Sequence, residues 1–130
     1  MWFVVLFSSS HFTSRNSLIS DLYTEWVKTK ERAISVLWQV LDLVLKPDHW
    51  SPLLHASDLD GLPVDAQSIT AVRWSIVGAM LRCDPPALAV NALLQVSGFN
   101  SLATLQMRCS HDELLRILKA GIAWLDVWYE

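Results

Sequence analysis

The groups that could carry chemistry gather in one stretch, HWSPLLHASDLDGLPVD, where His49 and His55 flank a loop that holds Asp58, Asp60 and Asp65. A histidine beside a carboxylate can act as an acid–base pair, and several such groups can bind a divalent metal. The spacing identifies neither chemistry, because a site on one connection needs further ligands that the sequence does not indicate. One hypothesis is therefore a small enzyme or a ligand- or metal-binding protein that uses His49 or His55 with Asp58 and Asp60.

The D-L-D-G sequence that begins at Asp58 can be compared with a calcium loop of the D-x-D-x-D-G type. With Gly61 at the sixth position, Ala56 would stand at the first ligand position and Gln67 at the twelfth. Two carboxylate ligands are then missing, so we predict no metal site. We interpret the aspartates as residues that bend the chain through side-chain hydrogen bonds, while Gly61 supplies a positive φ. A polar loop that binds a partner is the alternative.

Covalent catalysis and phosphate binding have no recognisable pattern in this chain. There is no G-x-S-x-G turn, and the four glycines are isolated at positions 61, 78, 98 and 121. Cys83 and Cys109 lack metal-ligand spacing, so we interpret both as small buried hydrophobic residues in a reducing cytosol. We predict no catalytic residue and no cofactor.

Composition indicates one domain with more apolar material than its core needs. The chain has 130 residues, of which 52% are hydrophobic, only 18% are charged and seven are tryptophan. Tryptophan favours both cores and interface hot spots, so part of this surface is expected to contact another protein. A net charge of −3 disfavours nucleic acid. The apolar run Trp2 to Phe7 is too short for a signal sequence or a membrane span, so we expect a soluble, cytoplasmic protein.

The apolar pattern predicts helices on both sides of the loop. Residues 1–16 are expected to form an arm or a short edge strand. Alternatively, the start codon is placed too far upstream and these residues are not part of the protein. Residues 17–130 are expected to form a single helical domain. Apolar residues recur every three or four positions from Ser17 to Lys46, which indicates one long helix or two joined near Thr29. Pro47 ends this pattern, and an ordered connection or small hairpin follows.

Three further helices are indicated in the second half. Ser68 is the expected N-cap of a central helix that carries Ala71 to Leu81. Asp84 is expected to cap a short helix that ends at Gly98, followed by a connection from Phe99 to Cys109. The sequence Ser-His-Asp-Glu at Ser110 matches a capping box and opens the last helix. The predicted fold is all-α, a compact bundle of four to five helices.

The stretch ASDLDGLPVD from Ala56, followed by AVRWSIVGA from Ala71, resembles a small family of uncharacterised proteins found in actinobacteria and phages. In that family an A-x-D-x-D-G-x-P-V-D loop precedes a helix with an A-V-x-W-x-x-x-G-A pattern. Many members carry Trp-Asn-Asp before the last helix, where this chain has Leu-Gln-Met-Arg-Cys from Leu105. The family is a domain of unknown function, so the resemblance implies a fold class and a shared loop, and no activity.

Two features of the helices suggest contacts. Gly78 inside an apolar helix suggests close approach by another backbone, and we expect a helix crossing there. Trp74 lies one turn earlier and either fills the core or forms the floor of a pocket beside the loop. The aromatic residues Trp124, Trp128 and Tyr129 at the C-terminus either dock back onto the domain or form a homodimer contact.

The leading hypothesis is a non-enzymatic cytosolic protein-binding or adaptor module, with the phage link that the resemblance implies. It would engage another protein through the acidic loop 56–65 and nearby aromatic residues. A third hypothesis is an inhibitor of a host or phage system that acts by acidic mimicry. The predicted binding residues are Asp58, Asp60, Asp65, Trp50, Trp74 and His55.

Overall fold

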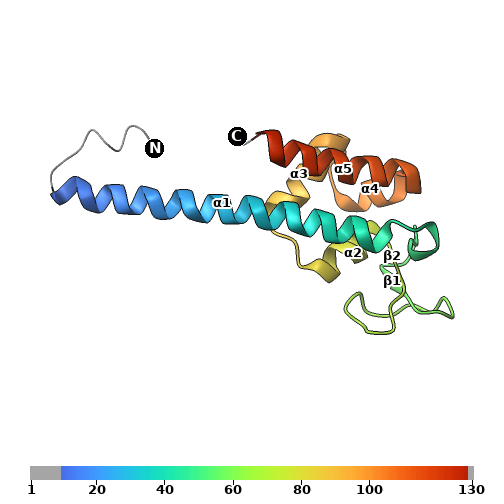
Figure 1. The fold of residues 1–130 in the computed structure, drawn as a ribbon. Coiled ribbons are helices and arrows are strands. Elements are labelled where there is room, and N and C mark those ends of the chain that lie inside the picture. The colour runs from blue at the N-terminus through green and yellow to red at the C-terminus, as the bar shows by residue number, and fades with distance from the viewer. Residues whose placement is uncertain (1–9, 129–130) are drawn as a thin grey trace.

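The computed structural model describes residues 10–128, with side chains described for residues 18–127. This part of the chain contains five α-helices, one short 3-10 helix and a two-stranded sheet (Figure 1), which confirms the predicted all-α bundle of four to five helices. The helices are α1 (Ser10–Val44), α2 (Ile76–Cys83), α3 (Ala87–Ser97), α4 (Leu102–Arg108) and α5 (His111–Trp128), with the 3-10 helix η2 (Pro47–His49) and the strands β1 (Ala56–Ser57) and β2 (Arg73–Trp74).

The first helix, α1, is continuous and about 52 Å long at 1.5 Å per residue. It does not break near Thr29, whose hydroxyl instead donates to the Glu25 carbonyl oxygen one turn earlier (2.8 Å). Of the predicted arm over residues 1–16, residues 1–9 lie outside the described residues, and α1 already begins at Ser10.

The core lies between the second half of α1 and the helices α2, α3 and α5, which pack against it. α5 runs antiparallel to α1 (Figure 1), and its first turn is joined to the end of α1, where His111 Nε2 lies 2.6 Å from the Val44 carbonyl oxygen. The buried α1 residues recur at helical spacing: Ala33, Val36, Leu37, Val40, Leu41 and Val44. Hydrophobic burial on this face therefore holds the bundle together.

The central helix begins later than predicted. α2 starts at Ile76 with Ser75 as its N-cap, because the Ser75 hydroxyl oxygen accepts a hydrogen bond from the Gly78 N–H (3.1 Å). The residues before Ser75 are extended and pair with β1, so strand pairing overrides the helical pattern there. Ser68, the predicted N-cap, lies in a turn and accepts a hydrogen bond from the Thr70 N–H (3.1 Å).

The predicted role of Asp84 was also wrong, and one helix was missed. Asp84 adopts a left-handed conformation (φ 51°) as the C-cap of α2, while Pro86 is the N-cap of α3. Gly98 ends α3 with φ 76°, as predicted. The expected connection before residue 110 contains α4, which begins where the Ser101 hydroxyl oxygen accepts from the Thr104 N–H (3.1 Å).

The capping box at the start of α5 is confirmed. The Glu113 N–H donates to the Ser110 hydroxyl, and the Ser110 N–H donates to the Glu113 carboxylate, both at 3.2 Å. The backbone and hydroxyl hydrogen bonds from Ser110 lower the pKa of Glu113 below its ordinary value. Among the described helices none is by itself long and apolar enough to cross a membrane, and only the bent pair of α3 and α4 reaches that length and composition together.

Candidate interaction loop

Most of the candidate site residues lie in a long loop that extends from the bundle, residues 51–72, which we call the docked loop. In Figure 1 it extends away from the bundle near the C-terminal end of α1, and it contains β1. Its base is held by the antiparallel pairing of β1 with β2, in which Ala56 lies opposite Trp74. The Ser51 N–H also donates to the Trp74 carbonyl oxygen (3.0 Å), and the Val64 N–H to the Ala56 carbonyl oxygen (3.1 Å). The start of the loop and β1 are therefore both bonded to β2, which leads into α2.

The first turn of the docked loop is built on Asp58. Its carboxylate accepts hydrogen bonds from the N–H groups of Asp60 and Leu62, both at 2.9 Å. The backbone closes the same turn through Gly61, which has φ 82° and donates to the Asp58 carbonyl oxygen (3.0 Å). Arg73 Nη1 donates to that carbonyl oxygen as well (2.9 Å). This confirms the interpretation for Asp58 and for the positive φ at Gly61, whereas Asp60, which was expected to form the turn in the same way, contributes only its backbone N–H.

A second turn connects the loop to the end of α2. The Asp65 carboxylate accepts a hydrogen bond from the Gln67 N–H (2.8 Å). The Gln67 side chain then donates to the carbonyl oxygens of Leu81 (2.9 Å) and Arg82 (3.1 Å). These carbonyls belong to the last turn of a helix, where the helix itself leaves acceptors without a partner. Asp65 therefore positions a side chain that caps α2.

Trp74 and Arg82 form the inner contact of the docked loop. Trp74 is buried, and its indole Nε1 donates to the Ala66 carbonyl oxygen (3.3 Å). The Arg82 guanidinium lies 5.0 Å from the centroid of the Trp74 ring and donates to the carbonyl oxygens of Ala66 (2.9 Å) and Ser68 (3.1 Å). A cation over an aromatic face is stabilising, more so when it is shielded from water. These contacts hold the far side of the loop against α2.

Gly78 allows the loop backbone to approach α2 closely. A Cβ atom at this position would overlap the carbonyl group of His55 and lie 2.9 Å from its Cα. The Ser75 N–H donates to the same His55 carbonyl oxygen (3.3 Å). The predicted close backbone approach is confirmed, but the approaching segment is the docked loop and not the helix that we expected.

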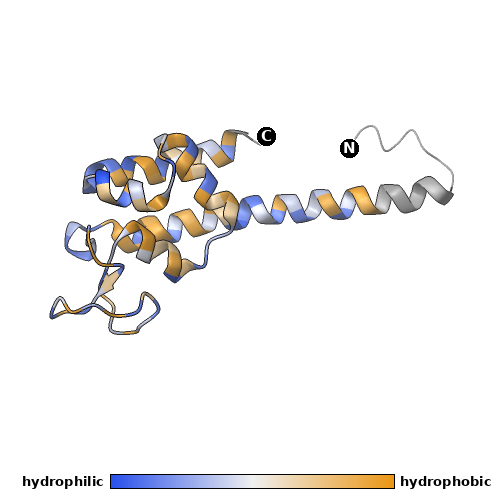
Figure 2. Cartoon of the chain, turned by 180° about the vertical axis from the view of Figure 1, so that it is seen from behind, coloured by the Kyte–Doolittle hydropathy of each residue, from blue (hydrophilic) through white to orange (hydrophobic). Residues whose placement is uncertain are grey.

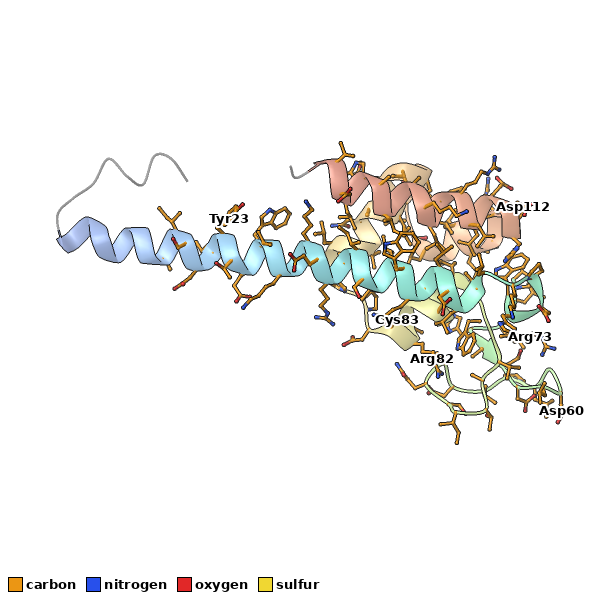
Figure 3. All side chains as sticks on the ribbon, in the orientation of Figure 1. Tyr23, Asp60, Arg73, Arg82, Cys83 and Asp112 are labelled. Carbon is orange, nitrogen blue, oxygen red and sulfur yellow. The ribbon has the colours of Figure 1, made fainter. Side chains whose placement is uncertain are left out.

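The docked loop exposes large apolar side chains. Four large side chains are 60–95% exposed, namely Leu53, Leu59, Leu62 and Ile69. Asp60 lies at the outer tip of the loop (Figure 3), and its carboxylate accepts no hydrogen bond from the part of the chain that the structure describes. No lysine or arginine occurs from residue 47 to residue 72. The sequence interpretation concentrated on the carboxylates and missed these leucine and isoleucine side chains.

The remaining candidate residues lie apart from one another. His49 lines a groove of about 350 Å³ together with Asp42, Lys46 and Trp74. The ring of Trp50 lies 5.2 Å from that of His111, centroid to centroid, and the His55 side chain is exposed. Within the described residues, no three histidine, cysteine, aspartate or glutamate side chains lie where they could jointly hold a metal ion.

Both cysteines are free thiols that are partly buried. Burial raises the pKa of Cys83, an effect that the nearby Arg82 charge partly opposes. Burial also raises the pKa of Cys109, and the Glu113 carboxylate adds to this. A thiol with a raised pKa is a poor nucleophile at neutral pH.

Comparison with known proteins gives no relative of this chain: no protein-family model, no curated protein and no solved structure matches it.

Proposed function

We propose that this protein is a non-enzymatic binding module that recognises another protein through the outward face of the docked loop. The observation that supports this most strongly is the exposure of Leu53, Leu59, Leu62 and Ile69 on a loop whose own turns are already closed by hydrogen bonds. Exposed apolar side chains that form a patch are typical of interaction sites, and we infer that these four side chains form one.

The order of the loop favours binding because little flexibility is lost on association. An immobilised flexible side chain costs about 0.5–1.5 kcal/mol at an interface, and a loop that must first order costs more. Burying a leucine or isoleucine side chain contributes about 1.5–3 kcal/mol. The internal bonds of Asp58 and Asp65 therefore support binding indirectly, by holding Leu59, Leu62 and Ile69 in place.

The charge of the loop indicates the kind of surface that would fit it. Asp60 lies at the outer tip of the loop, and Asp58 and Asp65 add negative charge, whereas the nearby Arg73 and Arg82 donate hydrogen bonds to loop carbonyl oxygens. A complementary partner would present an apolar patch bordered by lysine or arginine. We place the module in the cytoplasm, because free thiols are usual in a reducing compartment.

The test is a pull-down with mass spectrometry from lysate of the native host, using the wild type and a Leu59→Ser, Leu62→Ser, Ile69→Ser variant. We expect a partner that the wild type captures and the variant loses. Met107 is 84% exposed on α4, so Met107→Ser is a matched control that removes apolar surface elsewhere. A partner retained by the loop variant and lost by Met107→Ser would refute the proposal. Circular dichroism would verify that each variant is folded.

A small-ligand site is a second candidate, supported by the groove of about 350 Å³ at the end of α1. Asp42, Lys46 and His49 line it with polar groups over the Trp74 ring. Such a combination of an aromatic surface and a few polar groups is common in ligand sites. A fragment screen followed by tryptophan fluorescence would test it, with Lys46→Ala expected to abolish any binding there.

A further inference from the structure

A mainly apolar groove lies between α1 and α5, which Figures 1 and 2 show side by side from opposite sides of the molecule. The groove has a volume of about 380 Å³, and α1 contributes Ile34 and Trp38 to its lining. Trp38 is 54% exposed, although tryptophan is highly buried on average in folded proteins. The remaining lining residues come from α5: Lys119, Ile122, Ala123 and Asp126.

Two opposite charges stand on the α5 side of this groove. Lys119 and Asp126 are both exposed and are seven residues apart, which is about two helical turns or about 10.5 Å. They therefore lie on one line along α5 and are too far apart to pair with each other. Neither forms a salt bridge within the part of the chain that the structure describes. A complementary surface would carry a carboxylate and an ammonium group two turns apart, in the reverse order.

The same face of α5, turned end to end, carries those charges in that order. A two-fold rotation about an axis that crosses α5 between Ile122 and Ala123 exchanges positions 119 and 126, so Lys119 of each copy faces Asp126 of the other. This self-complementary pattern favours a second copy of the chain over an unrelated partner. Ala123 is exposed beside the axis, and a small side chain at a crossing allows two helices to approach closely.

The same axis relates the α1 side of the groove to itself. Ile34 and Trp38, its two lining residues on α1, are centred on Val36. This centre lies at the level of the axis on α5, because Gly121 is next to Leu37 across the helix pair: a Cβ atom at Gly121 would lie 3.4 Å from Leu37 Cδ1. The rotation therefore places Trp38 of each copy opposite Ile34 of the other.

We propose that this groove is the centre of a two-fold interface between two copies of the chain, in which the faces formed by α1 and α5 pack against each other. The α1 helices of the two copies run antiparallel, as do the α5 helices. The pair of Lys119 with Asp126 and the pair of Trp38 with Ile34 each occur twice, as an interface between identical subunits requires. The docked loops lie at opposite ends of this dimer, because each is near the C-terminal end of its own α1.

The two kinds of contact have different roles in this interface. Trp38 supplies apolar surface that association buries, and tryptophan is enriched among the residues that dominate binding energy. The ion pairs fix the orientation of the two copies. A parallel arrangement of the α5 helices would place Lys119 against Lys119 and Asp126 against Asp126, and such contacts between like charges are unfavourable.

The first test is the mass of the full chain by light scattering and sedimentation over a range of concentrations. The chain mass is 14.7 kDa, and we expect a dimer of twice that mass. Trp38→Ser, Lys119→Asp and Asp126→Lys should each weaken dimerisation at least tenfold. The controls Lys28→Asp and Asp21→Lys make the same charge changes at exposed α1 positions that do not line the groove, and they should leave the dimer unchanged. A monomer at every concentration would overturn the proposal, as would a dimer that tolerates Trp38→Ser.

The second test exchanges the two charges. The Lys119→Asp protein carries two negative groups in the groove and the Asp126→Lys protein carries two positive groups. A mixture of these variants should therefore form a heterodimer in which both pairs are complementary. The double variant should dimerise with itself nearly as tightly as the wild type. If neither the mixture nor the double variant recovers the dimer, the two residues do not face each other and the register is wrong. Circular dichroism would verify that each variant is folded.

The third test places a crosslink at the axis, in a background of Cys83→Ser and Cys109→Ser. Ala123→Cys should form a disulfide-linked dimer under mild oxidation, because the two copies of residue 123 lie beside each other at the axis. Ala103→Cys is the matched control, an exposed alanine on α4, and should not crosslink efficiently. Failure of Ala123→Cys to crosslink in a sample that is dimeric by mass would overturn this arrangement.

Discussion

Replacing Gly78 with alanine tests whether the docked loop really lies against α2. The added methyl group would overlap the His55 carbonyl group and lie 2.9 Å from the His55 Cα. A backbone neighbour cannot rotate away as a side chain can, so the loop or the helix must shift. Overpacking of this kind costs up to about 3 kcal/mol even where side chains can adjust.

Two further contributions nearly cancel in this variant. A shift at Gly78 disturbs the N-cap hydrogen bond to Ser75 (3.1 Å), which is worth about 1 kcal/mol. Alanine in place of glycine within a helix stabilises the folded state by about 1 kcal/mol. We therefore expect the free energy of unfolding to fall by about 3 kcal/mol, a large share of the roughly 5–15 kcal/mol that stabilises a typical domain.

The matched control is Gly121→Ala in α5, which has the same helix-propensity gain. Its Cβ would meet the ends of flexible side chains, Leu93 Cδ2 at 2.9 Å and Leu37 Cδ1 at 3.4 Å. These can rotate, so we expect a change within about 1 kcal/mol. Urea unfolding followed by circular dichroism at equal protein concentrations measures both variants. If the free energies of unfolding of Gly78→Ala and Gly121→Ala differ by less than about 1 kcal/mol, the close approach of the loop to α2 is wrong.

Three further outcomes follow from the hydrogen bonds and burial of individual residues. Asp58→Ala should lower the free energy of unfolding by about 1–2 kcal/mol, because two N–H groups lose their acceptor. Asp60→Ala should change the free energy of unfolding little. Thermal melting of both variants measures the difference. The pKa of Glu113 is lowered in the folded state. The Glu113 carboxylate therefore stabilises the fold fully above the ordinary carboxyl range, and this stabilisation is lost as the pH falls through the pKa of the folded protein. Glu113→Gln should make the free energy of unfolding depend less on pH in this acidic range. The pKa values of the Cys83 and Cys109 thiols are raised, so alkylation by iodoacetamide should be slow at pH 7 and accelerate above the ordinary thiol range; fast labelling at pH 7 would contradict their burial.

The sequence predicted the helices best where periodicity and capping agreed. α1 and α5 have long apolar repeats, and the Ser110 and Glu113 box marked the start of α5 correctly. The start of α2 could not be found in the same way. Ala71 to Trp74 fits a helical pattern locally, but its backbone pairs with Ala56 and Ser57, which lie far away in sequence. Such long-range pairing overrides local propensity.

The contacts within the loop that holds the candidate residues could be predicted only in part. The turn at Asp58 follows from local rules for aspartate and glycine, so it could be predicted. The packing of Arg82 on Trp74, and its hydrogen bonds to the loop carbonyls, join segments that only the folded chain brings together. For the same reason the exposure of Ile69 could not be distinguished from burial by residue type alone.

The proposed function depends above all on the docked loop being ordered before any partner binds, and hydrogen exchange measured residue by residue by NMR tests this directly. The N–H groups of Leu62, Gln67 and Val72 donate hydrogen bonds, whereas those of Leu59 and Ile69 donate to no described group. We predict that the first three exchange at least tenfold more slowly than the last two in the protein alone. Equal exchange of all five at the rate of an unfolded peptide would contradict a preformed binding surface.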